Sequence, residues 1–304
     1  MKRAILSLTI TTALAALLAG CETLDVITQV STSVGVATGK ISTQEADAIN
    51  RTASAAGKAF EQITPEQEYY IGRAVTATIL TDNKTANLKN ATHYLNVLGQ
   101  ALAMHSDKPE TFGGYHFAIM DTDEINAFAA PGGLILVSRG LLRCCRTEDA
   151  VAAVLAHEIG HVQLLHGLRA IRKSRLTSAL TILAAESAKN LGGEQLTELT
   201  TAFEGSISDI TGTLVNSGYS RTLESEADAA AITIMQRTGY NPSALKDMLK
   251  QMQARMPADD KGFGKTHPSP TDRIADITPL LPQAETGAVV KARQKRFEKA
   301  MKGV

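Results

Sequence analysis

The chain has 304 residues and a formal net charge of zero, with 31 basic and 31 acidic side chains. Nucleic-acid binding through bulk electrostatics requires a surplus of positive charge, so we expect no nucleic-acid partner. Hydrophobic residues make up 44% of the chain, aromatic residues only 4%, and tryptophan is absent. Length and composition therefore predict one large domain or two small ones, built mainly from packed helices.

The first residues, MKRAILSLTITTALAALLAGC, have the pattern of a secretion signal. Two basic residues precede an apolar stretch too short to span a membrane comfortably, and small residues precede a cysteine. Residues 1–20 resemble a bacterial lipoprotein signal peptide, which implies cleavage before Cys21 and lipid attached to Cys21. The alternative is an ordinary signal peptide with an incidental cysteine. Glu22 stands where the inner-membrane retention signal usually has Asp, so we expect an anchor in the outer membrane, on the periplasmic side.

Residues 21–60 are rich in Ser, Thr, Ala and Gly, which predicts a lipidated tether to the membrane. Ordered structure is expected from residue 61. The stretch TPEQEYYIGRAVTATIL offers Thr64 as N-cap, Pro65 at the first helical position and Gln67 for a capping box. A second helix is expected over residues 86–104.

The apolar pattern then changes from helical to alternating. Residues 115–121, YHFAIMD, alternate as in a strand, and residues 125–142, INAFAAPGGLILVSRGLL, predict a hairpin around Pro131 to Gly133. We expect a sheet of about three strands, with INAFAAPGG at its edge. The predicted fold is α+β and predominantly helical.

Helical patterns return after the hairpin. Thr147 is the expected N-cap of a helix that reads VAAVLAHEIGHVQLL, and another helix is expected from Ser220 to Thr238. A third begins near Pro242. Residues 187–218 contain five glycines and are expected to be less regular, either as mobile helical segments or a lid, or as ordinary loops. The basic stretch KARQKRFEKAMKG, within residues 283–304, predicts a terminal helix with a solvated face.

The helix after Thr147 contains the motif His-Glu-x-x-His. His157 and His161 are four residues apart, about 40° apart on one helical face, where two neutral imidazoles can bind one Zn²⁺. Glu158 lies one step around the helix, close enough to act as general base on a water at the metal. Burying these polar groups in an apolar helix without a partner is unfavourable, which favours a metal site over core histidines.

A third ligand is available in YSRTLESEADAAAITIM. Glu224 and Asp228 are four residues apart and face the same way, so Glu224 could bind the metal. Asp228 could then accept a hydrogen bond from the remote nitrogen of His157. Spacing alone leaves Glu224 and Glu226 as open alternatives for the third ligand.

The other histidines have less to indicate a role. His166 is rotated by about 140° from His161 on an ideal helix and is expected outside the metal site. Tyr219, just before the second motif, could pack near the site. No spacing of metal-ligand type is seen for His93, His105 and His116.

The motifs HEIGH and ESEAD together closely resemble the HtpX/Oma1-like zinc metallopeptidases, a gluzincin family, and within it the periplasmic lipoprotein branch (LoiP- and BepA-like). The likeness covers about residues 60–280 and extends through INAFAAPGGLILVSRGLL and THPSPTDRI. It implies a zinc metallopeptidase domain over residues 61–282 with one Zn²⁺. The roles it implies are ligands His157, His161 and Glu224, general base Glu158, and Asp228 behind the ligands.

The resemblance also gives THPSPTDRI a role. His267 and Arg273 would lie near the metal as transition-state stabilisers, or His267 could occupy the open coordination position and keep the enzyme latent. From the residues alone, His267 could equally lie on the surface, and Arg273 could form a structural ion pair.

The predicted sheet edge offers a place for substrate. An exposed edge pairs with an extended peptide through backbone hydrogen bonds, largely without regard to sequence, which suits unfolded chains. The substrate-binding residues would be Asn126, Ala127 and Phe128. Asn126 could hold a substrate carbonyl or amide, or could instead satisfy its own backbone.

The sequence therefore predicts a lipid-anchored zinc endopeptidase that hydrolyses unfolded or misfolded envelope proteins in protein quality control, with outer-membrane assembly factors as possible partners. The alternative is a metalloprotease-fold chaperone or assembly factor for outer-membrane proteins whose catalysis is latent. A third reading, structural zinc, requires a fourth strong protein ligand and no accessible water.

Overall fold

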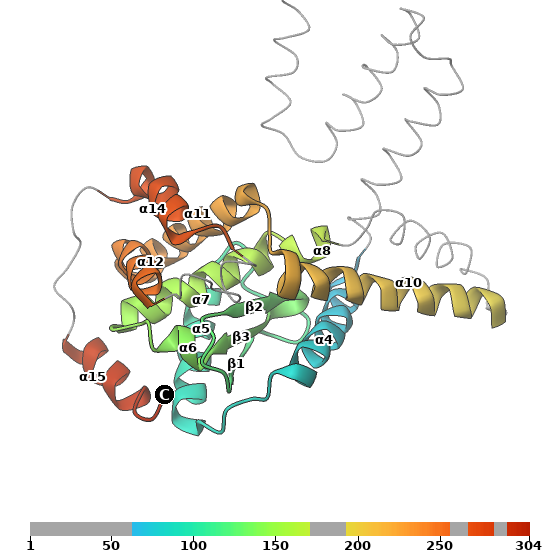
Figure 1. Cartoon of the computed structure of the whole chain (residues 1–304), viewed down its shortest axis with the longest axis horizontal. Helices are drawn as coiled ribbons and strands as arrows, with labels where there is room; N and C mark the ends of the chain where they lie inside the picture. Colours follow the sequence, from blue (N-terminus) through green and yellow to red (C-terminus); the bar gives the residue numbers. More distant parts are fainter. Residues whose placement is uncertain (1–62, 171–192, 256–266, 283–290) are drawn as a thin grey trace, which may run out of the picture. The chain divides into compact units, whose positions relative to one another are not determined.

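A computed structural model describes residues 63–170, 193–255, 267–282 and 291–304 (Figure 1). The predicted signal peptide, Cys21 and the tether lie outside these residues, so they stay predictions. Backbone contacts divide the chain into two compact units, and one of them comprises Thr64–Arg172 and Thr200–Val304. The helices and strands around the sheet belong to this unit, except that the helix over residues 193–212 begins in the other one.

The unit opens with two helices, α4 (Pro65–Asp82) and α5 (Lys89–Ala103). Helix α4 begins as predicted, because the Thr64 hydroxyl accepts from the Gln67 backbone N–H and the Gln67 side chain accepts from the Thr64 backbone N–H. Helix α5 starts three residues later than expected. Both helices stand beside a small sheet.

The sheet has three strands, β1 (His116–Met120), β2 (Ala127–Ala130) and β3 (Leu134–Ser138), in the order β1-β3-β2. Strand β1 is parallel to β3, and β2 is antiparallel to β3 across a short turn at Pro131–Gly133. The predicted α+β, mainly helical fold with three strands is confirmed, and β2 lies at an edge as expected.

Side chains and a neighbouring segment close the opposite edge, at β1. The Asn96 side chain donates to the Phe117 carbonyl and accepts from the Phe117 N–H, as a neighbouring strand would. The Ala86 N–H donates to the Ile119 carbonyl at 2.8 Å. These contacts satisfy an edge that would otherwise be open to pairing with other chains. Strand β2 forms the other edge of the sheet.

The remaining helices include those that carry the His-Glu-x-x-His motif and the Glu224 and Asp228 pair. They are α6 (Arg139–Leu142), α7 (Glu148–Gln163), α8 (His166–Arg169), α10 (Gly193–Gly212), α11 (Arg221–Thr238), α12 (Ser243–Arg255), α14 (Pro270–Ile277) and α15 (Lys291–Ala300). Among the described residues of the range 187–218, the helical alternative is confirmed and the loop alternative is wrong, because α10 continues directly into a π-helical turn at Thr213–Ser217. A glycine lowers helix stability by about 1 kcal/mol relative to alanine, which weakens a helix without breaking it.

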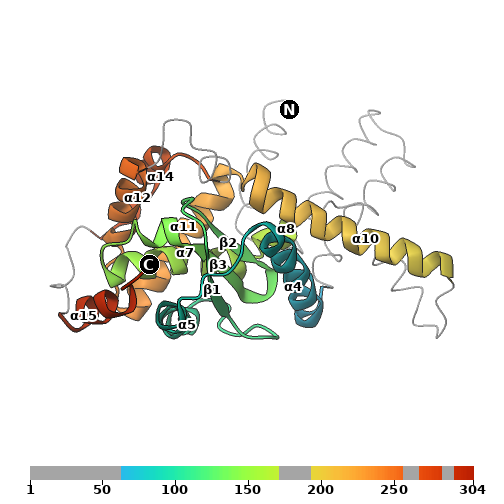
Figure 2. The same ribbon diagram turned by 60° about the horizontal axis from the view of Figure 1, so that its bottom comes forward.

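Helix α7 is the centre of the unit. It packs against α5, α11, α12 and β2 (Figure 1, Figure 2), and every residue from Glu148 to Val162 is buried. A helix enclosed on all sides is apolar all round, which accounts for its continuous run of alanine, valine and leucine. No helix in the described ranges is both long and apolar enough to cross a membrane.

The basic terminal helix α15 is only partly solvated. Phe297 and Ala300 are buried, and Arg296 reaches the first residue of α7, where its guanidinium donates to both carboxylate oxygens of Glu148 at 2.6 and 3.2 Å. The C-terminal helix thus braces the start of the helix that carries the histidine motif.

Replacing Arg296 by alanine should lower the free energy of unfolding by about 1–2 kcal/mol, since buried Glu148 loses its cation. The hydroxyls of Tyr94 and Tyr240 would remain as donors to Glu148. Denaturant unfolding measures the change, with Lys295→Ala on the exposed side of the same helix as control. Equal stability of the two variants would contradict the bracing role.

Candidate metal centre

A glycine allows the two motif-bearing helices to come close together. A methyl group at Gly160 of α7 would lie 2.9 Å from the Ala227 carbonyl oxygen of α11, closer than carbon atoms tolerate. Because Gly160 has no side chain, the backbone of α11 at Ala227 can approach the backbone of α7 closely. The first turn of α11 consequently brings Glu224 against His157 and His161.

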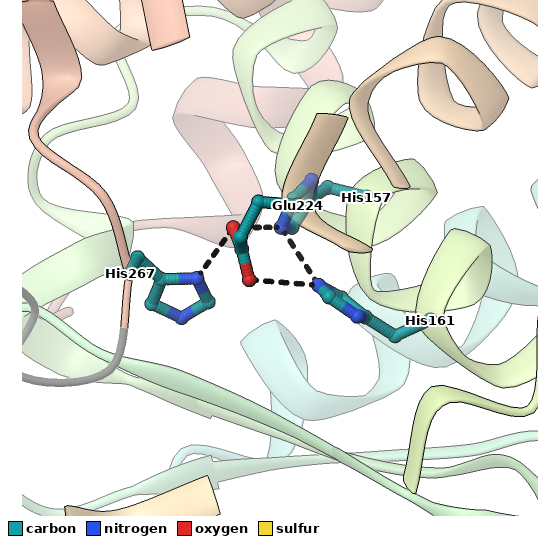
Figure 3. A group of neighbouring side chains, drawn as sticks. All are labelled: His157, His161, Glu224 and His267. Carbon is teal, nitrogen blue, oxygen red and sulfur yellow. Dashed lines mark hydrogen bonds and ion pairs between the residues drawn. The ribbon is translucent and has the colours of Figure 1, made fainter. Parts of the chain in front are cut away.

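Four side chains converge at this point (Figure 3). His157 and His161 come from α7, Glu224 from α11, and His267 from the segment just before α14. One donor atom from each residue lies within 4.8 Å of the others, and all four side chains are buried. The structure thus brings together the predicted ligands with the histidine of THPSPTDRI.

The distances between donor atoms fit a tetrahedral metal ion. The Nε2 atoms of His157 and His161 are 3.1 Å apart, and they lie 3.5 and 3.4 Å from the carboxylate oxygens of Glu224. Ligands about 2.0–2.1 Å from a tetrahedral centre are separated by about 3.3 Å. In addition, Oε1 of Glu224 is buried and makes no hydrogen bond within the described part of the chain. This orphaned oxygen is satisfied if it binds a metal.

The charge states of two proposed ligands, His161 and Glu224, also suit a cation. For His157, burial and Arg273 lower the pKa, but Asp228 and Glu224 outweigh them and raise it to about 9. Burial lowers the pKa of His161 to about 3, which keeps its imidazole neutral and its lone pair free. For Glu224, burial alone would raise the pKa, but His267, His157 and His161 hold it well below its usual range. The site therefore offers a neutral imidazole and a carboxylate, as a metal requires.

Glu158 stands beside the donor atoms without being one of them. Its side chain is buried, and burial raises the pKa of its carboxyl group, which makes it a better proton acceptor. It lines a cavity of about 10 Å³, the space of about one water molecule. The other lining residues come from β2 and from the segments around it: Ala127, Phe128, Ala129, Leu214, Gly218, Tyr219 and His267.

Asp228 and Arg273 lie behind the donor atoms. Oδ1 of Asp228 is 2.9 Å from Nδ1 of His157, and the Arg273 guanidinium donates to both Asp228 oxygens, at 2.6 and 3.0 Å. Arg273 thus forms a buried ion pair with Asp228, which is the structural ion pair that the sequence left open for this residue. Its Nη1 atom is also 3.8 Å from the Glu224 carboxylate. Burial would raise the pKa of Asp228, but Arg273 and His157 lower it to about 2.

The three predicted substrate-binding residues all lie in or next to strand β2. Oδ1 of Asn126 accepts from the Ala127 backbone N–H at 2.9 Å, so this side chain satisfies its own backbone, as one of its two alternatives required. Ala127 and Phe128 line the cavity beside Glu158. The edge strand and the candidate base are therefore neighbours.

Two residues play a larger part than the sequence indicated. The ring of Tyr219 stacks on that of His161, with centroids 4.4 Å apart and planes 19° apart. His166 is outside the donor cluster, as predicted, but its Nδ1 contacts Nδ1 of His161 at 2.8 Å. The 140° rotation expected on an ideal helix does not apply to His166, because α7 ends at Gln163 and Leu165 adopts a left-handed conformation. A histidine that soon follows a metal-binding helix is the signal that could have identified it.

A mainly helical α+β domain with a buried His-His-Glu group beside a sheet edge is the arrangement of a gluzincin-type peptidase. The model of peptidase family M48 matches residues 89–280, and the chain belongs to that family. The resemblance seen in the motifs is thereby confirmed.

Three relatives illustrate the similarity. The beta-barrel assembly-enhancing protease of Escherichia coli K12 is 33% identical over 192 residues, which is 61% of this chain and 38% of the relative. The mitochondrial metalloendopeptidase OMA1 of Schizosaccharomyces pombe is 36% identical over 162 residues, 53% of this chain and 44% of the relative. The metalloprotease LoiP of Escherichia coli K12 is 26% identical over 162 residues, 53% and 61% respectively. The chain thus spans less than two thirds of each relative.

Replacing Asp228 by asparagine in the metal-free protein should destabilise it by about 3 kcal/mol at pH 7, because buried Arg273 loses its anion. The folded-state pKa of Asp228, about 2, lies below its unfolded value. Its contribution is therefore present above about pH 4 and is lost as the pH falls towards 2.

Urea unfolding between pH 7 and pH 3 measures this effect. The difference between wild type and Asp228→Asn should shrink at the acid end, while Asp247→Asn, an exposed carboxylate on α12, should change stability by less than about 0.5 kcal/mol. A difference that is the same at every pH would mean that the Asp228 carboxylate is not stabilised by Arg273.

Proposed function

We propose that this chain is a zinc-dependent endopeptidase that hydrolyses peptide bonds of unfolded or misfolded envelope proteins. The observation that carries the proposal is the position of Glu158, a buried carboxylate beside a group of metal-ligand type yet outside it. A purely structural metal site has no need of a base there. Membership of peptidase family M48 supports the same chemistry.

In this proposal His157, His161 and Glu224 hold the zinc ion. Zinc supplies Lewis acidity, which activates water and polarises the carbonyl of the scissile bond. Glu158 takes the proton from the attacking water and hands it to the leaving amine. Asp228 keeps the His157 ring oriented through its contact with Nδ1.

Substrate recognition is proposed to occur along β2. The Ser138 N–H donates to the Asn126 carbonyl, so the alternation of an antiparallel pair turns the backbone groups of Ala127 and Ala129 away from β3. Asn126 already satisfies the Ala127 N–H, which leaves the groups of Ala129 and the Ala127 carbonyl for an extended peptide. Such pairing reads backbone and not sequence, which favours unfolded substrates.

The described conformation is closed, and we propose that it is latent. All four residues of β2 are buried, and the cavity beside Glu158 holds only about one water molecule. Nδ1 of His267 is 2.8 Å from Glu224, at the edge of the donor cluster. This closure also favours the second candidate function, a metalloprotease-fold chaperone or assembly factor whose catalysis is normally silent.

The proposed place of action is the periplasmic side of the outer membrane, through a lipid anchor at Cys21. The lipoprotein-like first residues support the anchor. The relative named beta-barrel assembly-enhancing protease supports outer-membrane assembly factors as partners.

A soluble form from residue 22 onward, without Cys21 and supplied with zinc, should cleave casein, and the Glu158→Gln variant should be slower by about 10²–10⁴-fold, because it lacks the general base. Zinc content measured on the same samples should be equal, since Glu158 is not a proposed ligand. Cleavage by the variant at the wild-type rate would remove Glu158 from the mechanism.

Replacing His267 by alanine separates its two proposed roles. If the contact of His267 with Glu224 keeps the site latent, the variant should cleave casein about tenfold faster. A factor of ten corresponds to the loss of one charge-assisted hydrogen bond of about 1.5 kcal/mol. Steady-state rates at saturating casein measure this. A fall in rate with zinc still bound would instead identify His267 as a stabiliser of the transition state.

A further inference from the structure

The two proposed histidine ligands differ in the group that contacts their second ring nitrogen, Nδ1. Nδ1 of His157 lies 2.9 Å from the Asp228 carboxylate. Nδ1 of His161 lies 2.8 Å from another imidazole nitrogen, Nδ1 of His166, whose side chain is completely buried. A histidine in this position contributes no donor atom to the metal group, so its contact with His161 needs a separate explanation.

The positions of the protons follow from the geometry. Nε2 of His161 faces the donor cluster, so a bound metal takes its lone pair and the ring proton sits on Nδ1. Nδ1 of His166 must then accept a hydrogen bond from this N–H, and the ring proton of His166 itself sits on Nε2. There Oε2 of Glu226 is 3.1 Å away and accepts it. The three side chains form one directed chain of hydrogen bonds.

The last acceptor of this hydrogen-bond chain, Glu226, lies at the protein surface. The Glu226 side chain is 40% exposed, and Arg169 donates to the same oxygen at 3.0 Å. Glu226, one of the two candidates for the third ligand, lies on α11 two residues after Glu224 and contacts His166, outside the donor cluster. One helix thus supplies a donor of the metal group and the last acceptor of the chain.

The backbone supplies an independent observation. Leu165 has φ 57°, the one positive φ of a residue other than glycine in the described ranges. A left-handed leucine costs about 1–2 kcal/mol, and such strain gathers at functional sites. Here the turn directs the next residue, His166, back onto His161.

We propose that His166 and Glu226 are positioning residues for the zinc ligand His161, which they hold in one tautomer and one ring orientation. This inference rests on the proposed zinc site. It gives both ligand histidines the support of a carboxylate, directly for His157 and through a second imidazole for His161. Partners of this kind typically change metal affinity by about 10–100-fold.

The zinc affinity of the protein, measured by competition with a chelator, tests the hydrogen-bond chain through His166 and Glu226. His166→Ala should bind zinc about 10–100-fold more weakly. His166→Asn should recover much of the loss, since its amide oxygen can accept from Nδ1 of His161. Glu226→Ala should fall between His166→Ala and wild type, and Arg237→Ala, which breaks an exposed ion pair with Asp107, should match wild type.

The visible spectrum of the cobalt-substituted protein is the second readout, because it reports ligand geometry and not stability. His166→Ala should shift the cobalt bands. Folded variants at His166 and Glu226 with wild-type zinc affinity and cobalt spectrum would overturn the proposal. If His166→Ala does not fold, the half-exposed Glu226→Ala decides alone. A His157→Ala variant that binds zinc as wild type does would refute the zinc site itself, and the positioning role with it.

Discussion

Close packing of α11 on α7 is the contact on which the site depends. Gly160 leaves room for the Ala227 carbonyl oxygen, and this approach carries Glu224 to within 3.4–3.5 Å of the two imidazole Nε2 atoms. A side chain at Gly160 would force this contact to shift and would disturb the alignment of Glu224 with the histidines. The motif on α7 alone would then offer only two donors.

The apolar surroundings of α7 determine the chemistry of these groups. Burial keeps His161 neutral and raises the pKa of Glu158, while Glu224 and Asp228 stay ionised because cationic or polar partners face them. An uncompensated charge at this depth would destabilise the fold, and the carboxylates of Glu224 and Asp228 accordingly face His267 and Arg273. The result is a buried carboxylate and a group of metal-ligand type beside edge strand β2, the arrangement on which the proposed function rests.

Local patterns predicted much of this. The capping box at Thr64, the alternation of the strands and the four-residue spacings depend only on neighbouring residues, and they located the helices, the sheet and the donor motifs. Features set by distant contacts or backbone exceptions were not accessible. Helical phase could not place His166 because Leu165 leaves the right-handed region, and the glycines of residues 187–218 could not show that α10 tolerates them. Only the fold pairs Arg273 with Asp228 and turns Asn126 onto its own strand.

X-ray absorption at the zinc edge of the purified mature chain tests the central claim most directly. The expected result is one zinc per chain, bound by nitrogen and oxygen at about 2.0–2.1 Å, with scattering from two imidazole rings that is lost in His157→Ala. The buried thiols of Cys144 and Cys145 are the competing donors elsewhere in the unit. Sulfur ligands at about 2.3 Å, or no stoichiometric zinc, would contradict a metal centre built from α7 and α11.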